Sequence, residues 1–96
     1  MHLDEFKASL AGAAPPAGLH LPGQALWWLA KGDWHRAHRC CQDSHNEHGA
    51  WVHAHLHRVE GDERNAAGWY QRAGKTPSEA AHDADWEEIA RATLSV

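Results

Sequence analysis

The sequence predicts an all-α domain built from five to six short helices in antiparallel hairpins. Apolar residues recur at helical spacings along most of the chain, and no segment shows the period of two that a half-buried strand requires. Gly-Asp and proline-containing stretches interrupt this pattern. The length of 96 residues suits a single domain. We therefore expect one helical domain over 1–96, with an N-terminal helix and linker (1–20), two repeat-like hairpins (21–77) and a C-terminal covering helix (78–96).

The N-terminal part of the chain contains two of these helices. The first is expected over His2–Ala14, with apolar residues on one face and acidic residues in its first turn. Pro15 and Pro16 end it, because proline cannot continue the hydrogen-bond ladder of a helix. Pro22 suits the first turn of the second helix, which is expected to run to about Gly32.

Four further helices are expected in the rest of the chain. Asp33 is expected to cap the third, which carries both cysteines. A turn at Asn46–Gly49 leads to the fourth helix, at about Ala50–Glu60, and the fifth covers Asp62–Ala73. Ser78 is expected to cap the sixth. The inner face expected for this last helix consists of His82, Trp86, Ile89, Ala90 and Thr93.

Tryptophan is expected to supply much of the core. The chain has six tryptophans but one Phe, one Tyr and one Met, and each tryptophan can bury roughly 200 Å². Leucine fills the remaining space, and the frequent alanines favour helices that approach one another closely. So many tryptophans in a small domain also predict a surplus of aromatic rings at the surface.

Charge and hydropathy argue against two classes of protein. A formal net charge of −4 at pH 7 disfavours nonspecific nucleic-acid binding, which needs a basic face. No apolar run reaches the roughly 18 residues of a membrane-spanning helix, and no signal peptide is recognisable. Cys40 and Cys41 are adjacent, a spacing that strains a disulfide. We expect a cytoplasmic protein with two reduced thiols, no nucleic-acid partner and no membrane association.

The second and third helices are repeated in the fourth and fifth. Residues 25–41 align without gaps on residues 54–70, an offset of 29 positions (residue 25 against residue 54). The identical pairs are Ala25/Ala54, Gly32/Gly61, Asp33/Asp62 and Ala37/Ala66. Each of these residue types has a structural role: glycine permits a tight turn, aspartate caps the next helix, and a small alanine lets two helices approach.

The residue order of the second hairpin resembles the second half of a tetratricopeptide unit. The matching positions are Gly61, Asp62, Ala66, Tyr70, Ala73 and Pro77. The resemblance covers about residues 21–77 and implies a right-handed stack of helical hairpins. The repeat is shorter than the family's usual length of about 34 residues, and His53 and His57 occupy positions that the family normally fills with apolar side chains. The same segment is similar to a group of small uncharacterised bacterial proteins, which imply no activity.

His53, His57 and Glu60 form the first candidate site. Their spacing of four and three residues places them within one narrow sector of the fourth helix. Two imidazole nitrogens and a carboxylate can bind a divalent metal such as zinc from a single helix. The glutamate base of the HExxH motif is missing, since Ala54 follows His53.

Three roles are open for these two histidines. The apolar stripe on the opposite side of the fourth helix would turn them towards solvent or a groove, whereas the tetratricopeptide register would point them at Trp69 and Tyr70. Buried histidines would need hydrogen-bond partners such as Asn65. A structural role is preferred, with a small-ligand or catalytic pocket and a metal site as alternatives. If His53 and His57 are buried and neutral, stability should fall as the pH drops through about 6.5.

Asn65, Trp69, Tyr70 and Arg72 form the second candidate site, on the fifth helix. Asn65 and Arg72 share the side of Trp69, where they could orient a carboxylate or a peptide backbone. Trp69 also suits the core, because it alternates with small alanines at helical spacing. We therefore expect these four residues to bind a ligand or a peptide.

The remaining histidines form weaker patterns. His35 and His38 are an i, i+3 pair, and His45 and His48 flank the turn that precedes His53, where the three could converge. No order of serine or cysteine with histidine is interpretable as a catalytic constellation.

The leading hypothesis is a small helical-repeat protein that binds a protein or peptide through a groove. Two repeats fall short of the three or more that usually stabilise a solenoid, so a homodimer is expected to cover the leftover face. The alternative is a metal-binding, small-ligand or catalytic domain centred on His53, His57 and Glu60, with Tyr70 and Arg72 completing an enzyme pocket. Enzyme activity is not favoured, and no cofactor is expected apart from a divalent metal such as zinc.

Overall fold

The computed structural model describes residues 1–95 and confirms the all-helical class over that range, with six helices and no strand. The helices are α1 (Leu3–Ser9), α2 (Leu21–Ala30), α3 (Trp34–Gln42), α4 (Glu47–Glu60), α5 (Glu63–Ala73) and α6 (His82–Leu94). The Cα radius of gyration is 12.1 Å and the principal extents are 33 × 26 × 24 Å. These dimensions suit one small domain of this length.

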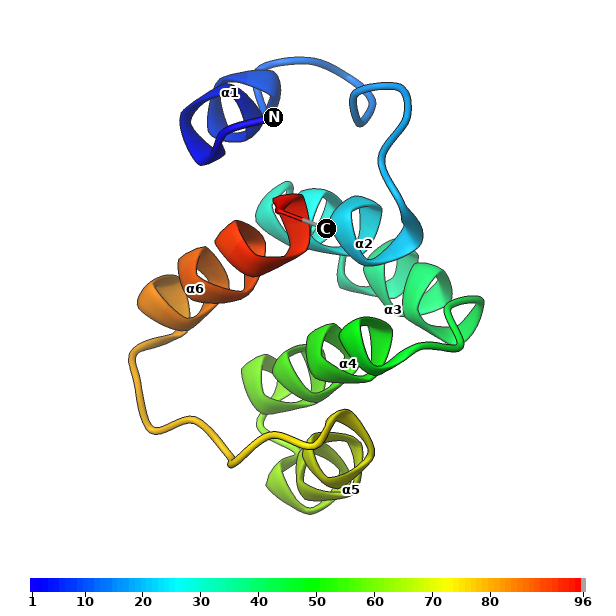
Figure 1. The fold of residues 1–96 in the computed structure, drawn as a ribbon, viewed down its shortest axis with the longest axis vertical. Coiled ribbons are helices and arrows are strands. Elements are labelled where there is room, and N and C mark those ends of the chain that lie inside the picture. The colour runs from blue at the N-terminus through cyan, green and yellow to red at the C-terminus, as the bar shows by residue number, and fades with distance from the viewer. Residues whose placement is uncertain (96) are drawn as a thin grey trace.

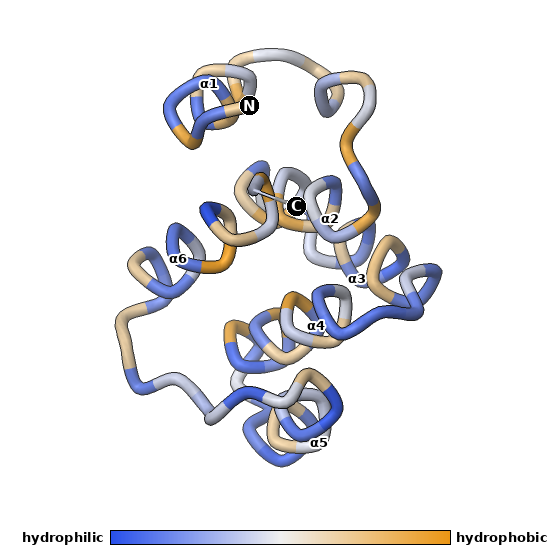
Figure 2. Tube along the Cα trace, viewed as in Figure 1, coloured by the Kyte–Doolittle hydropathy of each residue, from blue (hydrophilic) through white to orange (hydrophobic). Residues whose placement is uncertain are grey.

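Helix α4 lies at the centre of the fold. It packs against α2, α3, α5 and α6, while α1 covers the molecule from the side of α6 (Figure 1). Every residue of α4 from Gly49 to His57 is buried. Yet the helix carries hydrophilic as well as hydrophobic residues (Figure 2). The central helix therefore brings polar side chains, three histidines among them, into the interior.

The two hairpin loops have the same geometry. Gly32 and Gly61 adopt φ angles of 84° and 90°, in the left-handed region that favours glycine. The amide of the following aspartate bonds to the carbonyl five residues earlier, at 2.9 Å for Asp33 and 2.8 Å for Asp62. Each aspartate side chain then accepts a hydrogen bond from the amide three residues later. The internal repeat seen in the sequence is thus also a repeat of local structure.

Tryptophans do supply the core, but they do not form an exposed surplus. Trp27 is fully buried and Trp51 is 8% exposed, and the other four are partly buried against the core. Among the described residues, Met1 is the one large hydrophobic side chain that is exposed. Trp86 stacks on Phe6 with ring centroids 5.8 Å apart, which joins α6 to α1. The expectation of surface aromatic rings is wrong, because close helix packing covers them.

Two predicted boundaries in the first half of the chain are wrong. Helix α1 ends at Ser9 rather than Ala14, well before the prolines. The expected turn at Asn46–Gly49 is the first turn of α4 instead, because the Asn46 side chain accepts a hydrogen bond of 2.7 Å from the amide of Gly49. Asn46 is therefore an N-cap.

The last helix also differs from its prediction. It begins at His82 after Ala81, and Ser78 does not cap it. The Ser78 hydroxyl accepts a hydrogen bond from the amide of Ala80, within the preceding linker. His82, expected on the inner face, is exposed, while Asp85 is buried.

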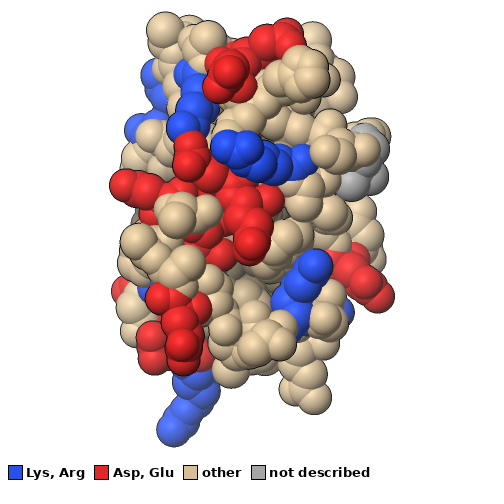
Figure 3. Space-filling view, turned by 60° about the vertical axis from the view of Figure 1, so that its left-hand side comes forward, with Lys and Arg blue, Asp and Glu red and all other residues tan. Residues whose placement is uncertain are grey.

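Acidic side chains gather at the centre of one face, where basic side chains are fewer (Figure 3). This distribution agrees with the net charge of −4. None of the described helices combines the length and the apolar character needed to span a membrane.

Candidate metal centre

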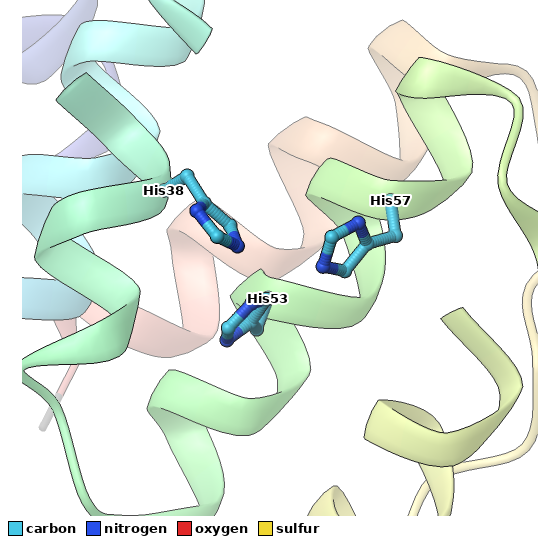
Figure 4. A group of neighbouring side chains, drawn as sticks. All are labelled: His38, His53 and His57. Atoms are coloured by element: carbon cyan, nitrogen blue, oxygen red, sulfur yellow. The ribbon is translucent and has the colours of Figure 1, made fainter. Parts of the chain in front are cut away.

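The packing of α3 against α4 brings three histidines together. His38 comes from α3, and His53 and His57 come from successive turns of α4 (Figure 4). Each ring offers a nitrogen, and these three nitrogens all lie within 4.8 Å of one another. The imidazole centroids are 4.7 to 5.2 Å apart. Histidines so closely grouped in a protein are candidate ligands for a metal ion.

Trp34 holds His38 in this position. Its indole stacks on the His38 ring, with centroids 4.9 Å apart and an interplanar angle of 11°. The indole N–H donates a hydrogen bond of 2.9 Å to the carbonyl of Leu56, on the neighbouring helix α4. Trp34 therefore ties the first turn of α3 to α4, one helical turn away from His38.

Glu60 orients His57. The Nδ1 atom of His57 lies 2.8 Å from the Glu60 carboxylate, so Nδ1–H donates to this oxygen. In the neutral imidazole the other ring nitrogen, Nε2, then carries the free lone pair. A carboxylate that fixes the tautomer and orientation of a histidine in this way is a common companion of metal sites.

His53 is a buried member of the group and has one ring nitrogen without a hydrogen-bond partner. The residue is 3% exposed. Its ring stacks on Trp69, with centroids 3.8 Å apart and an interplanar angle of 12°. The Nδ1 atom is buried and has no hydrogen-bond partner among the described residues. Leaving a buried polar atom unpaired costs about 1–3 kcal/mol, a cost that a bound ion or water would relieve.

The environment of His53 and His38 keeps these two imidazoles neutral. Burial lowers the pKa of His53 to about 4, and the neighbouring charges of His38, His57 and Arg72 act in the same direction. Burial, followed by the charge of His57, also lowers the pKa of His38. Both rings are therefore unprotonated at neutral pH, as metal coordination requires.

The two predicted candidate sites meet in one cavity. A cavity of about 700 Å³ is lined by all three histidines together with Asn65, Trp69 and Arg72. The Arg72 guanidinium lies over the Trp69 ring, 4.8 Å from its centroid. The Asn65 amide nitrogen lies 3.5 Å from Nδ1 of His57 and contacts it without a hydrogen bond, because Nδ1–H donates to Glu60. Six residues from three helices thus form one polar site.

Tyr70 stands apart from this site. It is 2% exposed and belongs to a different cavity, which it shares with Arg58 and Ser78. The reason is helical geometry, because adjacent residues on α5 point about 100° apart and Trp69 faces α4 at the histidines. The predicted group of Asn65, Trp69, Tyr70 and Arg72 is therefore divided, with three members in the histidine cavity.

Glu60 also has a different position from the one its spacing implies. It is not part of the group formed by His38, His53 and His57, and it groups instead with His57 and Asp62. Its side chain is 42% exposed and bonds to His57. The third close nitrogen comes from His38, which the sequence marked only as a weak pair with His35. The signal that points to His38 is Trp34, which stands one helical turn before it.

The convergence of His45, His48 and His53 that the sequence allows is not seen. His45 lines the cavity but does not belong to the close group, and His48 lies beside Trp51 with ring centroids 5.6 Å apart. His35 is exposed. The cysteine thiols are free, and burial raises the pKa of Cys41, which disfavours its reactive thiolate form.

No family model, curated protein or solved structure matches this chain.

Proposed function

We propose that this protein binds one divalent transition-metal ion, such as zinc, through His38, His53 and His57. The observation that carries the proposal is the convergence of three ring nitrogens within 4.8 Å in a largely buried place. The unpaired Nδ1 of His53 and the Glu60–His57 hydrogen bond support it independently.

The donor set indicates the class of metal. Imidazole nitrogens suit zinc, copper, nickel and iron, whereas magnesium and calcium prefer oxygen ligands. A zinc–nitrogen distance of 2.0–2.1 Å places two nitrogens of a tetrahedral site about 3.3 Å apart. The three rings therefore need small rotations towards one another when the ion binds.

Calorimetry on untagged protein tests this proposal. After removal of metal with a chelator, titration with zinc sulfate should show one ion bound per chain. Zinc should also raise the melting temperature, because an ion at about 100 times its dissociation constant adds about 2.7 kcal/mol of stability. No binding and an unchanged melting temperature would refute the proposal.

A matched pair of variants locates the site. His38→Gln removes one nitrogen of the group and should weaken zinc binding by about tenfold or more. His35→Gln changes an exposed histidine on the same helix and should leave zinc affinity unaltered. Equal effects of the two substitutions would show that zinc binds elsewhere.

The protein- or peptide-binding repeat is the second candidate function. It is supported by the shared loop geometry of the α2–α3 and α4–α5 hairpins, which suits a tetratricopeptide-like pair flanked by α1 and α6. Dimerisation remains part of this proposal. Sedimentation over a range of concentrations and recovery of a defined partner would support it, and a stable monomer that recovers no partner would oppose it.

A further inference from the structure

The three-histidine group leaves room for a ligand on the metal. A tetrahedral ion needs four donors, and among residues 1–95 no further His, Cys, Asp or Glu joins His38, His53 and His57 in their close group. The cavity of about 700 Å³ adjoins these three side chains. The fourth coordination position is therefore open to water or to a small molecule.

Arg72 provides a second positive point in the same cavity. No carboxylate of the described residues forms a salt bridge with its guanidinium. The guanidinium lies over the Trp69 ring, with its central carbon 4.8 Å from the ring centroid. An arginine that lies over an aromatic ring, with its N–H groups unpaired by carboxylates of the described residues, is suited to bind the carboxylate of a ligand.

Trp69 contacts both His53 and Arg72. The His53 imidazole stacks on the indole, with centroids 3.8 Å apart and an interplanar angle of 12°. The Arg72 guanidinium also lies over the indole, 4.8 Å from the ring centroid. The histidine group and Arg72 are thus two separate positive points beside one indole, in the same cavity.

The rest of the lining is compatible with an anion. Asn65, Gln42 and Ser44 contribute neutral polar groups that can bond to the body of a ligand. Glu47 is the one carboxylate among the described lining residues, and it is exposed at the start of α4. The positive charges of the metal and Arg72 therefore exceed the single negative charge of Glu47.

We infer that the metal-loaded cavity binds a small dicarboxylate, with one carboxylate on the open position of the metal and the other on Arg72. This inference rests on the proposed metal site. Two separate positive points in one cavity favour a ligand with two acidic groups joined by a short chain.

Calorimetry with the zinc-loaded protein tests the inference. Succinate and glutarate should bind about tenfold more tightly than butyrate, which has one carboxylate on a chain of similar length. Arg72→Gln, loaded with one zinc ion per chain, should abolish this preference. Arg64→Gln, an exposed change on the same helix but outside the cavity, should retain the preference.

The outcomes separate the two proposals. If zinc binds as proposed but the wild-type protein shows no preference for dicarboxylates, the inference is wrong and the metal site stands. Metal analysis after the titration must find zinc still bound, and its loss to the dicarboxylate would overturn the inference. If His38→Gln leaves zinc binding intact, the metal site and the inference both fail.

Discussion

His55 and Asp85 form a hydrogen bond of 2.8 Å between α4 and α6, in a place where each side chain is 1% exposed. Arg58 donates to the same carboxylate oxygen at 3.2 Å and also to the backbone carbonyl of Ala80. The other carboxylate oxygen of Asp85 is buried without a partner among the described residues. This network joins α6 and the linker before it to the central helix.

Removing Asp85 should destabilise the fold strongly. Asp85→Ala removes the acceptor that buried His55 and partly buried Arg58 share, and breaking a buried ion pair in this way costs about 3–5 kcal/mol. Urea unfolding would measure the loss. The matched control is Glu88→Ala, an exposed change on the same helix that should alter stability by no more than about 0.5 kcal/mol. Similar losses in the two variants would contradict a stabilising role for the network.

Removing Glu60 should weaken metal binding more than it weakens the fold. Glu60→Ala takes away the acceptor that orients His57, and loss of such a partner typically lowers metal affinity by about 10–100-fold. Glu60→Gln, whose amide oxygen still accepts a hydrogen bond, should restore part of the affinity. Zinc titration measures both variants, with Glu63→Gln as the control on the neighbouring helix. A Glu60→Ala protein with wild-type affinity would show that His57 needs no orienting group.

The metal-free protein should lose stability as the pH falls from about 6.5 to about 4. The pKa of His53 is lowered from its ordinary value of 6.5 to about 4, by burial first and then by the charges of His38, His57 and Arg72. Within this window the unfolded chain binds a proton that the folded chain excludes. The free energy of unfolding is therefore highest above the unfolded-state pKa and decreases below it.

Urea unfolding in the presence of a chelator, between about pH 7 and about pH 5, measures this dependence. His53→Gln should make it shallower, because the substituted side chain does not titrate. The pKa values of His38 and His55 are also lowered by burial, so part of the dependence should persist in this variant. A stability that rises as the pH falls would contradict the burial of neutral histidines.

Substitution of two glycines by alanine should change stability in opposite directions, depending on the backbone conformation at each. Gly61→Ala should cost about 1–2 kcal/mol, because φ at this residue is 90°. No neighbouring atom stands within 4 Å of an added Cβ, so the cost comes from the backbone conformation alone. Gly68 also has open space around it but lies within α5 at ordinary helical angles. Gly68→Ala should therefore stabilise the protein, by about 0.5–1 kcal/mol. Thermal or urea unfolding that gives both substitutions the same sign would refute this account.

The sequence predicts well those features that depend on local interactions. Gly61 and Asp62 specify a left-handed turn and a cap within a few residues, and the structure has both. The i, i+4 spacing of His53 and His57 likewise places them on neighbouring turns of one helix, with imidazole centroids 4.9 Å apart. The sequence does not distinguish a turn from a helix cap at Asn46, because asparagine favours both for the same reason, its short side chain bonding to nearby amides.

Features that join distant segments were not predictable in this way. His38 enters the site because Trp34 bonds to the Leu56 carbonyl, and no periodicity in α3 records that contact. In the sequence, Asp85 resembles any acidic surface residue. In the fold it is buried, and His55 and Arg58, which are distant in the chain, bond to its carboxylate.

The sequence by itself determined the helical class, the two repeated hairpin loops and the pair of histidines on α4, because propensity, capping and helical spacing act over a few residues. The tertiary structure alone decided that α4 is buried on all sides from Gly49 to His57. It thereby made His53 an enclosed, neutral imidazole, supplied His38 from α3, and brought Arg72 of α5 to the same cavity. The physical reason is that the protonation state and the hydrogen-bond partners of a polar side chain depend on its neighbours, and here the neighbours come from other helices.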